Sequence, residues 1–394
     1  MDIPASAGLD IELRGDTLSL LFARGKYRMN IDHGNAPGGS VFISHAHSDH
    51  VHALGERRLP SAASCADPTV NAREDNPSRS SGGRAIHPSC TVLTSTGTRR
   101  LIEKRYPSLL SGCNIHEGAT FSHPAMAGLE ARLVPNGHML GSRGLVVPRD
   151  PSSADAIFYL TGDFTTHPAR LFPPALPVKA DVLACECTFG NPKFEFPPYP
   201  ELKKEIVDWI DSSLRHGPAI LYGYSLGKNQ ELLSLLWPFA DRVTILADDE
   251  TCKMADVYRA CGVPLPACEP VKKYEGGTYL EESKNYILLQ PPGARFSERY
   301  KRLDSVACRR AIFSGWARNR RWVDRFDVDA GFPLSDHPCF SDIVSFIEAC
   351  SPSTVILHHG DGTDVKRKLQ EKLKGYFYVR LPRDVKIVTT NGRG

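Results

Sequence analysis

The feature that most constrains this chain is the segment His45-Ala46-His47-Ser48-Asp49-His50, which holds four potential metal ligands within six residues. It follows the apolar run at residues 41–44, whose composition predicts a β-strand. Imidazoles and carboxylates are the ligands that zinc prefers where a site keeps a position open for water. His45 and His47 alternate and can face one ion, while Asp49 and His50 can turn toward a second. We therefore expect a metal centre at the end of a strand.

Four residues do not complete two metal sites, so further ligands are expected downstream. Strand-like runs at residues 129–135 and 156–161 lead into Gly137-His138 and Gly162-Asp163. A Gly-His or Gly-Asp pair alone often marks only a turn. Their order after the first cluster makes His138 and Asp163 candidate ligands.

Composition bounds the class of protein. The chain has 394 residues, 41% of them hydrophobic, which is enough for one large domain or two. No apolar run approaches the roughly 18 residues of a membrane span, and no secretory leader is evident. Eleven cysteines without a C-x-x-C pair fit a reducing cytoplasm. Cys185 and Cys187 share a face of a predicted strand and could bind metal, although small core residues are the favoured interpretation.

Taken together, these motifs resemble the metallo-β-lactamase superfamily. Residues 186–190, Glu-Cys-Thr-Phe-Gly, resemble the element that opens its β-CASP branch of nucleases, and residues 335–337 and 357–361 resemble that branch's later histidine motifs. Residues 188–192, 224–228 and 315–316 are similar to compact archaeal and bacterial mRNA 3′-end-processing-factor-like exonucleases and to ligase-associated DNA exonucleases. Departures are Cys187 in place of Ser or Thr, the Pro338-Cys339-Phe340 segment, and an interruption at residues 60–89. None removes a ligand.

The resemblance implies an α/β fold, a metallo-β-lactamase αββα sandwich with an inserted β-CASP α/β domain. Residues 1–190 and 335–394 would form the sandwich and residues 191–334 the insertion. The alternation of helical and strand patterns after residue 200 independently predicts a parallel sheet. Residues 60–89, rich in Ser, Pro, Arg, Asn and Gly, are expected to form a mobile surface loop.

For the site, the resemblance implies one zinc ion on His45, His47, His138 and Asp163, and a second on Asp49, His50, His359 and the shared Asp163. Asp49 and Asp163 would thereby serve in catalysis, through a water that attacks phosphorus. The resemblance places His337 beside the scissile phosphate, with Glu186 accepting its other N–H. An alternative is that Asp336-His337 caps a helix that starts near Ser341.

Two further features could bind the nucleic-acid backbone. Ser225, Gly227 and Lys228 stand between a strand and a helix, where backbone N–H groups and the ammonium can bind a phosphate, or where they form only a turn. Residues 295–325 contain ten Lys or Arg against three acids, interleaved with Tyr300, Phe313, Trp316 and Trp322. Such a run is either a solvated face or a path for a single strand.

Three function classes compete: a nuclease, a small-molecule hydrolase of the same fold, and a non-catalytic nucleic-acid-binding subunit. A non-catalytic subunit would be expected to have lost metal ligands, but all the expected ligands are present. A small-molecule hydrolase would not be expected to have an insertion, but residues 191–334 are one. We therefore expect a cytoplasmic zinc-dependent nuclease, an exonuclease on single-stranded RNA or DNA in RNA 3′-end processing and decay or in DNA repair. Eukaryotic DNA-repair members often have valine at the position of His359, so a histidine there slightly favours RNA over DNA as the substrate. Cleavage polarity, endonuclease activity and assembly, as a homo-oligomer or in a larger complex, stay open.

Overall fold

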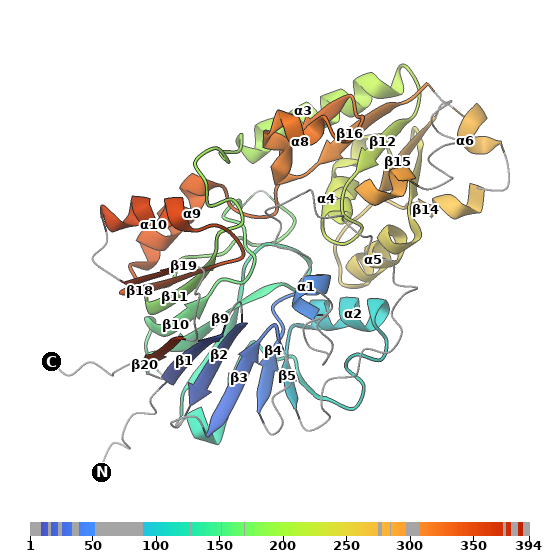
Figure 1. Cartoon of the computed structure of the whole chain (residues 1–394). Coiled ribbons are helices and arrows are strands. Elements are labelled where there is room, and N and C mark those ends of the chain that lie inside the picture. Colours follow the sequence, from blue (N-terminus) through green and yellow to red (C-terminus); the bar gives the residue numbers. More distant parts are fainter. Residues whose placement is uncertain are drawn as a thin grey trace, which may run out of the picture.

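The structure is a computed structural model that describes residues 9–14, 17–22, 26–33, 39–51, 90–126, 128–150, 152–168, 170–274, 278–283, 285–296, 307–372, 376–379 and 385–388. The loop expected at residues 60–89 lies outside these. The described residues form a mixed α/β fold with three sheets, which confirms the expected α/β class (Figure 1). No helix in the described ranges is both long and apolar enough to cross a bilayer.

The first sheet has the strand order β20-β1-β2-β3-β4-β5-β6. Its strands are β1 (Leu9–Arg14), β2 (Thr17–Phe22), β3 (Tyr27–Ile31), β4 (Ser40–Phe42), β5 (Thr91–Leu93), β6 (Asn114–His116) and β20 (Val385–Val388). Neighbours are antiparallel from β20 to β3 and parallel from β3 to β6. The short helix α1 (Ser48–Val51) follows β4, and α2 (Thr96–Arg105) follows β5.

The second sheet has the order β19-β18-β11-β10-β9-β8-β7. Its strands are β7 (Thr120–Ser122), β8 (Glu130–Pro135), β9 (Arg143–Pro148), β10 (Ala156–Leu160), β11 (Ala180–Glu186), β18 (Thr354–His358) and β19 (Tyr376–Val379), and η3 (Pro124–Met126) lies between β7 and β8. Strands β10, β11, β18 and β19 are parallel. Cys185 and Cys187, at the end of β11, lie in the hydrophobic core.

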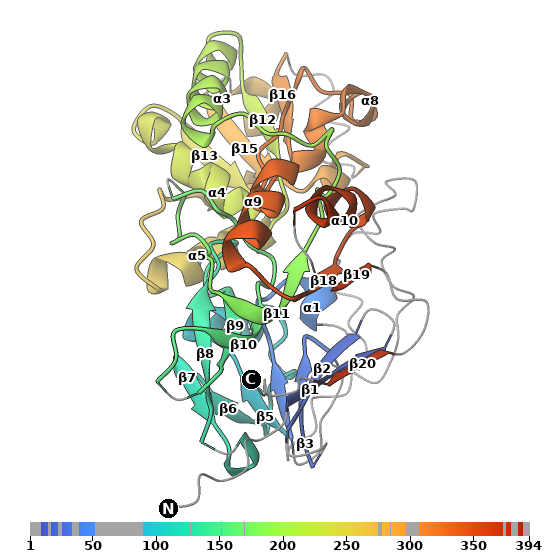
Figure 2. The same ribbon diagram turned by 90° about the vertical axis from the view of Figure 1, so that its left-hand side faces the viewer.

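These two sheets pack face to face, because the inner faces of β1–β4 and β8–β11 share one hydrophobic cluster. A second cluster joins the outer face of the second sheet to α9 (Phe340–Cys350) and α10 (Thr363–Gln370). Figure 2 shows these two helices covering that sheet. The C-terminal part of the chain thus returns to the layers that the N-terminal part begins.

The third sheet, of order β14-β13-β15-β12-β16-β17, is parallel throughout, as predicted. Its strands lie between residues 219 and 332, inside the segment expected to be an insertion: β12 (Ala219–Tyr222), β13 (Thr244–Ala247), β14 (Glu269–Pro270), β15 (Tyr286–Gln290), β16 (Arg309–Phe313) and β17 (Ala330–Phe332). The helices with it are α3 (Tyr199–Leu214), α4 (Lys228–Leu235), η4 (Trp237–Phe239), α5 (Asp249–Ala260), η5 (Val271–Tyr274), α6 (Tyr279–Glu282), η6 (Pro292–Phe296), η7 (Gly315–Arg318) and α8 (Arg320–Val323).

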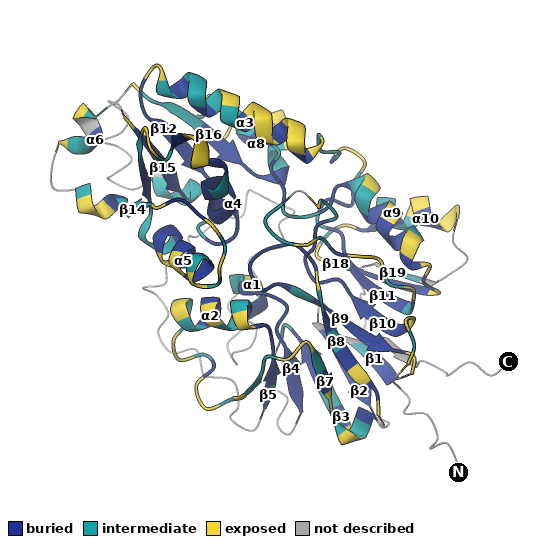
Figure 3. Ribbon diagram, turned by 180° about the vertical axis from the view of Figure 1, so that it is seen from behind, coloured by how far each residue is buried: buried dark blue, intermediate teal, exposed yellow. Residues whose placement is uncertain are grey.

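Helix patterning explains how this part packs. Leu202, Ile206 and Ile210 recur every fourth residue on α3 and are buried against the third sheet. Helix α5 begins after Asp248, whose carboxylate accepts hydrogen bonds from the first backbone amides of the helix. The same helix lies beside α2 (Figure 3). Arg105 of α2 and Glu250 of α5 form an ion pair at 3.1 Å. The third sheet is therefore held against the two-sheet layer next to α1 and α2.

Candidate metal centre and active site

Strand direction brings distant residues to one edge of the second sheet. Strands β8 and β10 are both antiparallel to β9, so they run in the same direction as β11 and β18. The C-terminal ends of these four strands carry His138, Asp163, Glu186 and His359. The histidine segment that begins at His45 reaches the same place from the end of β4. Functional groups at the carboxyl ends of strands are a common arrangement in α/β proteins.

Two turns at this edge have unusual backbone geometry. Gly162, just before Asp163, has φ of 59°, and a Cβ there would lie 3.1 Å from Asn136 Nδ2. His359 has φ of 56° although it is not glycine. Residues held in the left-handed region are uncommon and concentrate at functional sites. Both turns aim a side chain at the centre formed by the other residues.

Four side-chain atoms form a compact cluster: His45 Nε2, His47 Nδ1, His138 Nε2 and Asp163 Oδ2. His47 Nδ1 lies 3.1 Å from His45 Nε2 and 3.2 Å from His138 Nε2. Asp163 Oδ2 lies 3.5 Å from His45 Nε2 and 3.8 Å from His138 Nε2. Four ligands with bonds of about 2.1 Å in a tetrahedron are about 3.4 Å apart. The spacing therefore fits one metal ion at the middle of these atoms.

The outward-facing nitrogens of two of these histidines are already engaged. His47 Nε2 lies 3.3 Å from the carbonyl oxygen of Leu226, and His138 Nδ1 lies 3.1 Å from that of Asp336. A carbonyl only accepts, so each of these nitrogens carries the proton and the other nitrogen presents its lone pair to the cluster. Such outer hydrogen bonds orient metal-binding imidazoles.

A second group consists of His50, Asp163 and His359. His50 Nε2 lies 3.6 Å from Asp163 Oδ2, and His359 Nδ1 lies 3.2 Å from Asp163 Oδ1. His50 Nε2 is buried and has no hydrogen-bond partner within the described part of the chain, as expected of an atom meant for a metal ion. Asp49 lies at the rim, with its side chain 57% exposed and its Oδ2 3.7 Å from His50 Nε2. Asp163 stands between both groups.

Asp32 belongs to the site and was missed by the sequence reasoning. Its Oδ2 accepts a hydrogen bond from His50 Nδ1 at 2.9 Å, and its Oδ1 accepts one from the Ser44 amide at 2.7 Å. It follows β3 directly, with φ of 50°. The signal that could have revealed it is a carboxylate that closely follows a buried strand, as Asp163 follows β10.

The electrostatics of the cluster favour a cation. Burial lowers the pKa of His138 to about 3, so this imidazole is neutral and able to bind metal. Burial also disfavours a charged His50, but the carboxylates of Asp49, Asp163 and Asp32 outweigh it and raise the pKa of His50 to about 10. A proton and a metal ion compete for the same lone pair, so the negative field that holds the proton also attracts a cation.

Glu186 and His337 form a pair beside the first cluster. His337 Nδ1 lies 2.9 Å from both oxygens of Glu186, which is fully buried and also accepts hydrogen bonds from the Phe164 amide and the Thr188 hydroxyl. Although burial disfavours the imidazolium, the Glu186 carboxylate raises the pKa of His337 to about 10. The His337 ring centroid lies 4.9 Å from that of His138. The site therefore holds a protonated imidazole next to the ligand cluster.

The helix-cap alternative for this segment does not hold. Helix α9 begins at Phe340, and its N-cap residue Cys339 makes no side-chain cap hydrogen bond. Asp336 is instead paired with Lys228, and His337 with Glu186. Both side chains face the ligand cluster and not the helix.

The expected phosphate-binding residues before α4 are placed differently from the prediction. The Gly227 amide donates to Gln230 Oε1 at 2.7 Å, and the Lys228 side chain is 2% exposed with its Nζ 3.1 Å from Asp336 Oδ1. A phosphate contact by Gly227 or Lys228 stays a prediction, and the internal contacts of both donors count against it. Ser225 donates to the carboxylate that caps α5, and its role stays a prediction.

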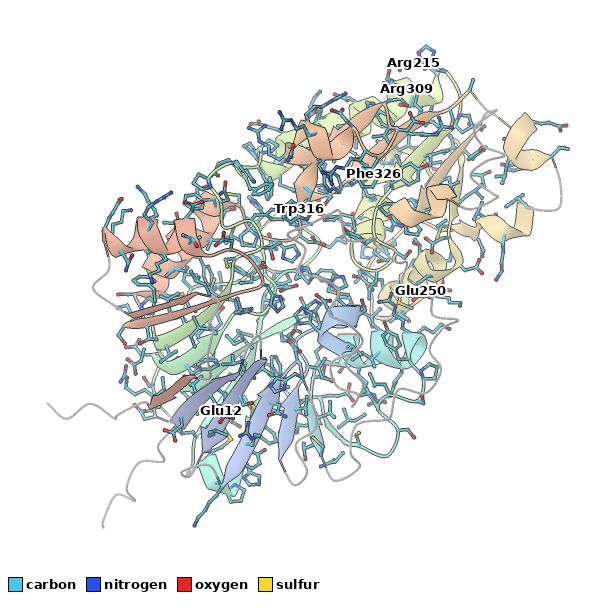
Figure 4. All side chains as sticks on the ribbon, viewed as in Figure 1. Glu12, Arg215, Glu250, Arg309, Trp316 and Phe326 are labelled. Carbon is cyan, nitrogen blue, oxygen red and sulfur yellow. The ribbon has the colours of Figure 1, made fainter. Side chains whose placement is uncertain are left out.

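The basic run is also revised by the structure. Residues 297–306, including Tyr300, lie outside the described residues, while Phe313 and Trp322 are buried core side chains and not surface aromatics. Trp316 is half-buried where the third sheet meets the other two, with its ring 5.0 Å from Phe189 (Figure 4). Phe189 in turn lies 6.1 Å from the His337 ring. Four exposed cations lie along the same segment: Arg318, Arg320, Arg321 and Arg325.

Comparisons with known proteins give relatives but no family assignment, since no family model matches the chain. A "Probable DNA ligase" of Opitutus terrae is 28% identical over 337 residues, which are 85% of this chain and 28% of that protein. "Transcription termination factor FttA" of Lokiarchaeum sp. is 29% identical over 133 residues, 32% of this chain and 21% of that protein. An "Uncharacterized protein in lig 3'region" of Acidianus ambivalens is 29% identical over 125 residues, 32% of this chain and 84% of that protein.

The chain thus spans less than a third of the ligase and of FttA. Among solved structures, a protein of unknown function from Enterococcus faecalis V583 matches with a TM-score of 0.61 at 13% identity. That match covers 98% of this chain and 100% of the other. At this identity it shows a shared fold only, while the sequence relatives are proteins named for DNA ligation and for transcription termination.

Proposed function

We propose that this chain is a zinc-dependent nuclease of the metallo-β-lactamase superfamily, β-CASP branch, that hydrolyses phosphodiester bonds of single-stranded RNA or DNA. The observation that carries the proposal is the juxtaposition of the buried ligand cluster with the Glu186–His337 pair. We further propose that the chain acts as an exonuclease in RNA processing or in DNA repair. Support comes from relatives whose names refer to DNA ligation and transcription termination.

The fold is consistent with this assignment. Two seven-stranded sheets packed face to face, with helices outside, are what an αββα sandwich requires, and the third sheet stands where an inserted domain is expected. We infer that residues 1–190 and 335–394 form the first unit and residues 191–334 the second. A hydrolase of small molecules does not need a parallel sheet of this size beside its site.

The donor set fits zinc. His45, His47, His138 and Asp163 would hold one ion, and Asp49, His50, His359 and the shared Asp163 a second. When bound, such ions supply a lowered pKa for a water molecule and neutralise negative charge on phosphate oxygens. Asp32, Leu226 and Asp336 keep three of the imidazoles oriented for this role.

His337 supplies the proton. Its Nδ1–H donates to Glu186, and its raised pKa keeps Nε2 protonated at neutral pH. From its place beside His138, Nε2–H can donate to the oxygen that leaves phosphorus, which lowers the barrier to breaking the bond. Glu186 does not touch the substrate in this scheme and acts by orienting and charging the imidazole.

The test is single-turnover cleavage of end-labelled single-stranded RNA and DNA by the zinc-loaded protein. His337→Ala should lower the rate by roughly 10²- to 10⁴-fold while zinc content and nucleic-acid binding stay close to those of the parent. His216→Ala, at an exposed histidine after α3, is the matched control and should cleave normally. Absence of cleavage of either strand by the parent protein, or full activity of His337→Ala, would overturn the proposal.

A further inference from the structure

Four oppositely charged side chains form a buried cluster behind the metal centre: Arg170, Lys228, Glu231 and Asp336. The Lys228 Nζ lies 3.1 Å from Asp336 Oδ1 and 3.4 Å from Glu231 Oε2, and Arg170 donates to the same Glu231 carboxylate. None of the four side chains is more than 14% exposed. Two cations face two anions, so the cluster is neutral as a whole.

The cluster joins three parts of the chain. Arg170 lies in the connection between β10 and β11, Lys228 and Glu231 lie in the first turn of α4, and Asp336 follows β17. The Arg170 guanidinium also lies 5.3 Å from the ring centroid of Tyr199 at the start of α3. Burying four charges is costly, and removing one partner leaves an unpaired charge in the protein interior. Alternative positions of these segments are therefore strongly disfavoured.

The backbone of the same segments holds the metal-binding histidines. The Asp336 carbonyl accepts a hydrogen bond from His138 Nδ1–H. The Leu226 carbonyl, two residues before Lys228, accepts one from His47 Nε2–H. Arg170 also donates to the Ser335 carbonyl. The Ser335 hydroxyl oxygen accepts a hydrogen bond from the His337 backbone amide at 3.1 Å. A shift of the cluster would therefore move the acceptors of two ligands and the residue that carries the proton.

We propose that Lys228 is a positioning residue: through Asp336 it holds the inserted sheet against the active-site segment at residues 335–337, and so sets the orientation of His47, His138 and His337. This inference rests on the proposed function, since it assigns a role within that site. It replaces the phosphate contact that the sequence had suggested for Lys228. The two roles differ in what they predict, because a phosphate contact sets substrate affinity whereas a positioning residue sets the rate of the bound complex.

The test compares Lys228→Met, Asp336→Asn and their double variant with the parent. Lys204→Met is the control, because Lys204 on α3 pairs with Asp208 at 2.6 Å but is 78% exposed. Each protein is titrated with end-labelled single-stranded RNA and DNA for Kd and for the saturating single-turnover rate. Each is also loaded with Co²⁺ in place of Zn²⁺, because the visible absorption of Co²⁺ reports ligand geometry without any substrate.

We expect Lys228→Met to lower the saturating rate by at least about 10-fold while Kd changes less than about 2-fold. Its Co²⁺ spectrum should differ from that of the parent, whereas Lys204→Met should match the parent in every measurement. Asp336→Asn should lose rate by a similar factor. The double variant should be no slower than the slower single variant, because the two residues act as one unit.

Stability separates positioning from general loss of folding. The double variant retains the neutral Arg170–Glu231 pair, so it should melt at a higher temperature than Lys228→Met and yet remain slow. Recovery of both melting temperature and rate in the double variant would contradict the proposal. If Lys228→Met does not fold, the double variant is compared with Asp336→Asn: equal rates support the proposal, and a further multiplied loss contradicts it.

Failure of this inference is distinguishable from failure of the proposed function. If the parent cleaves neither nucleic acid, a changed Co²⁺ spectrum in Lys228→Met, with Lys204→Met unchanged, still supports positioning. If the parent cleaves and Lys228→Met weakens Kd with an unchanged saturating rate and an unchanged spectrum, Lys228 is a phosphate contact. That result would overturn the positioning role and leave the nuclease assignment intact.

Discussion

Glu186 illustrates how one buried carboxylate can set the chemistry of its neighbour. It is fully buried, and each of its oxygens accepts two hydrogen bonds, one of them from His337. Burial disfavours the charged imidazole, but the carboxylate outweighs this effect and raises the pKa of His337 to about 10. His337 is thus protonated below that pKa and loses its proton above it.

Glu186→Gln should therefore make the proposed cleavage reaction more sensitive to alkaline pH. Removing the carboxylate lowers the pKa of His337, so the pH at which activity is lost on the basic side should fall. At acidic pH, where His337 is protonated in both proteins, the rate of the variant should be closer to that of the parent. In a His337→Ala background the same change should have little further effect, because the two residues act together. The measurement is the pH dependence of the single-turnover rate; an unshifted basic limb would show that Glu186 does not control His337.

Lys228 shows the limit of residue-level prediction from sequence. A Gly-Lys pair before a helix favours a phosphate site, and nothing nearby in the sequence shows that the ammonium is buried. Its partner Asp336 is more than a hundred positions away and is brought to it only by the third sheet. In contrast, the proximity of His45, His47, His138 and Asp163 was predictable, because these residues follow strand ends in motifs with their own spacing.

Among the elements, those with a regular pattern were predictable and those with mixed character were not. The expected helix at residues 201–214 and strand at residues 219–222 agree with α3 and β12 to within two residues. Strand β16 was hidden in the basic run because it opens with two arginines. Arg309 lies over the Trp209 ring at 5.0 Å, and both arginines are half-buried, so their charges do not mark an exposed segment.

The turn between β12 and α4 gives a prediction at this scale. Gly227 has φ of 87°, and a Cβ there would lie 3.3 Å from His47 Nε2. Gly262 has φ of 85° but open space around its Cβ position, so it is a matched control. Both alanine variants should lose about 1 to 2 kcal/mol of stability from backbone strain, and only Gly227→Ala should lose zinc affinity. Equal zinc affinity in both variants, by competition with a chelator, would contradict a role for this turn.

At the scale of the whole molecule, the small net charge does not reveal a local concentration of positive charge. The net charge is only +3, yet η7 and α8 carry exposed arginines. Trp316, which is also in η7, packs against Phe189, and Phe189 packs against the ring of His337. The sequence left this run open as either a solvated face or a path for a single strand, and its aromatic members Phe313 and Trp322 are core side chains. Exposure along a strand or helix depends on the packing partner, which composition does not reveal.

These arginines should contribute to binding through phosphate charge. Replacing Arg318, Arg320 and Arg321 with alanine should make the slope of log affinity for a single strand against log salt shallower by about 2, since each contact contributes about 0.7. Replacing Lys203, Lys204 and Arg215, from α3 and its C-terminal end, tests the same loss of charge elsewhere. Equal slopes for the two triple variants would place the strand on another surface.

The central claim is that the clustered histidines and Asp163 hold the metal ions that the reaction needs, and the most direct test is metal content measured together with cleavage. Protein purified without chelators should contain about two zinc ions per chain, and Asp163→Ala should lose both most of its zinc and its activity, because Asp163 serves both groups of ligands. A correctly folded protein with reproducibly less than one zinc per chain, or an Asp163→Ala variant that retains zinc and cleaves normally, would contradict the account.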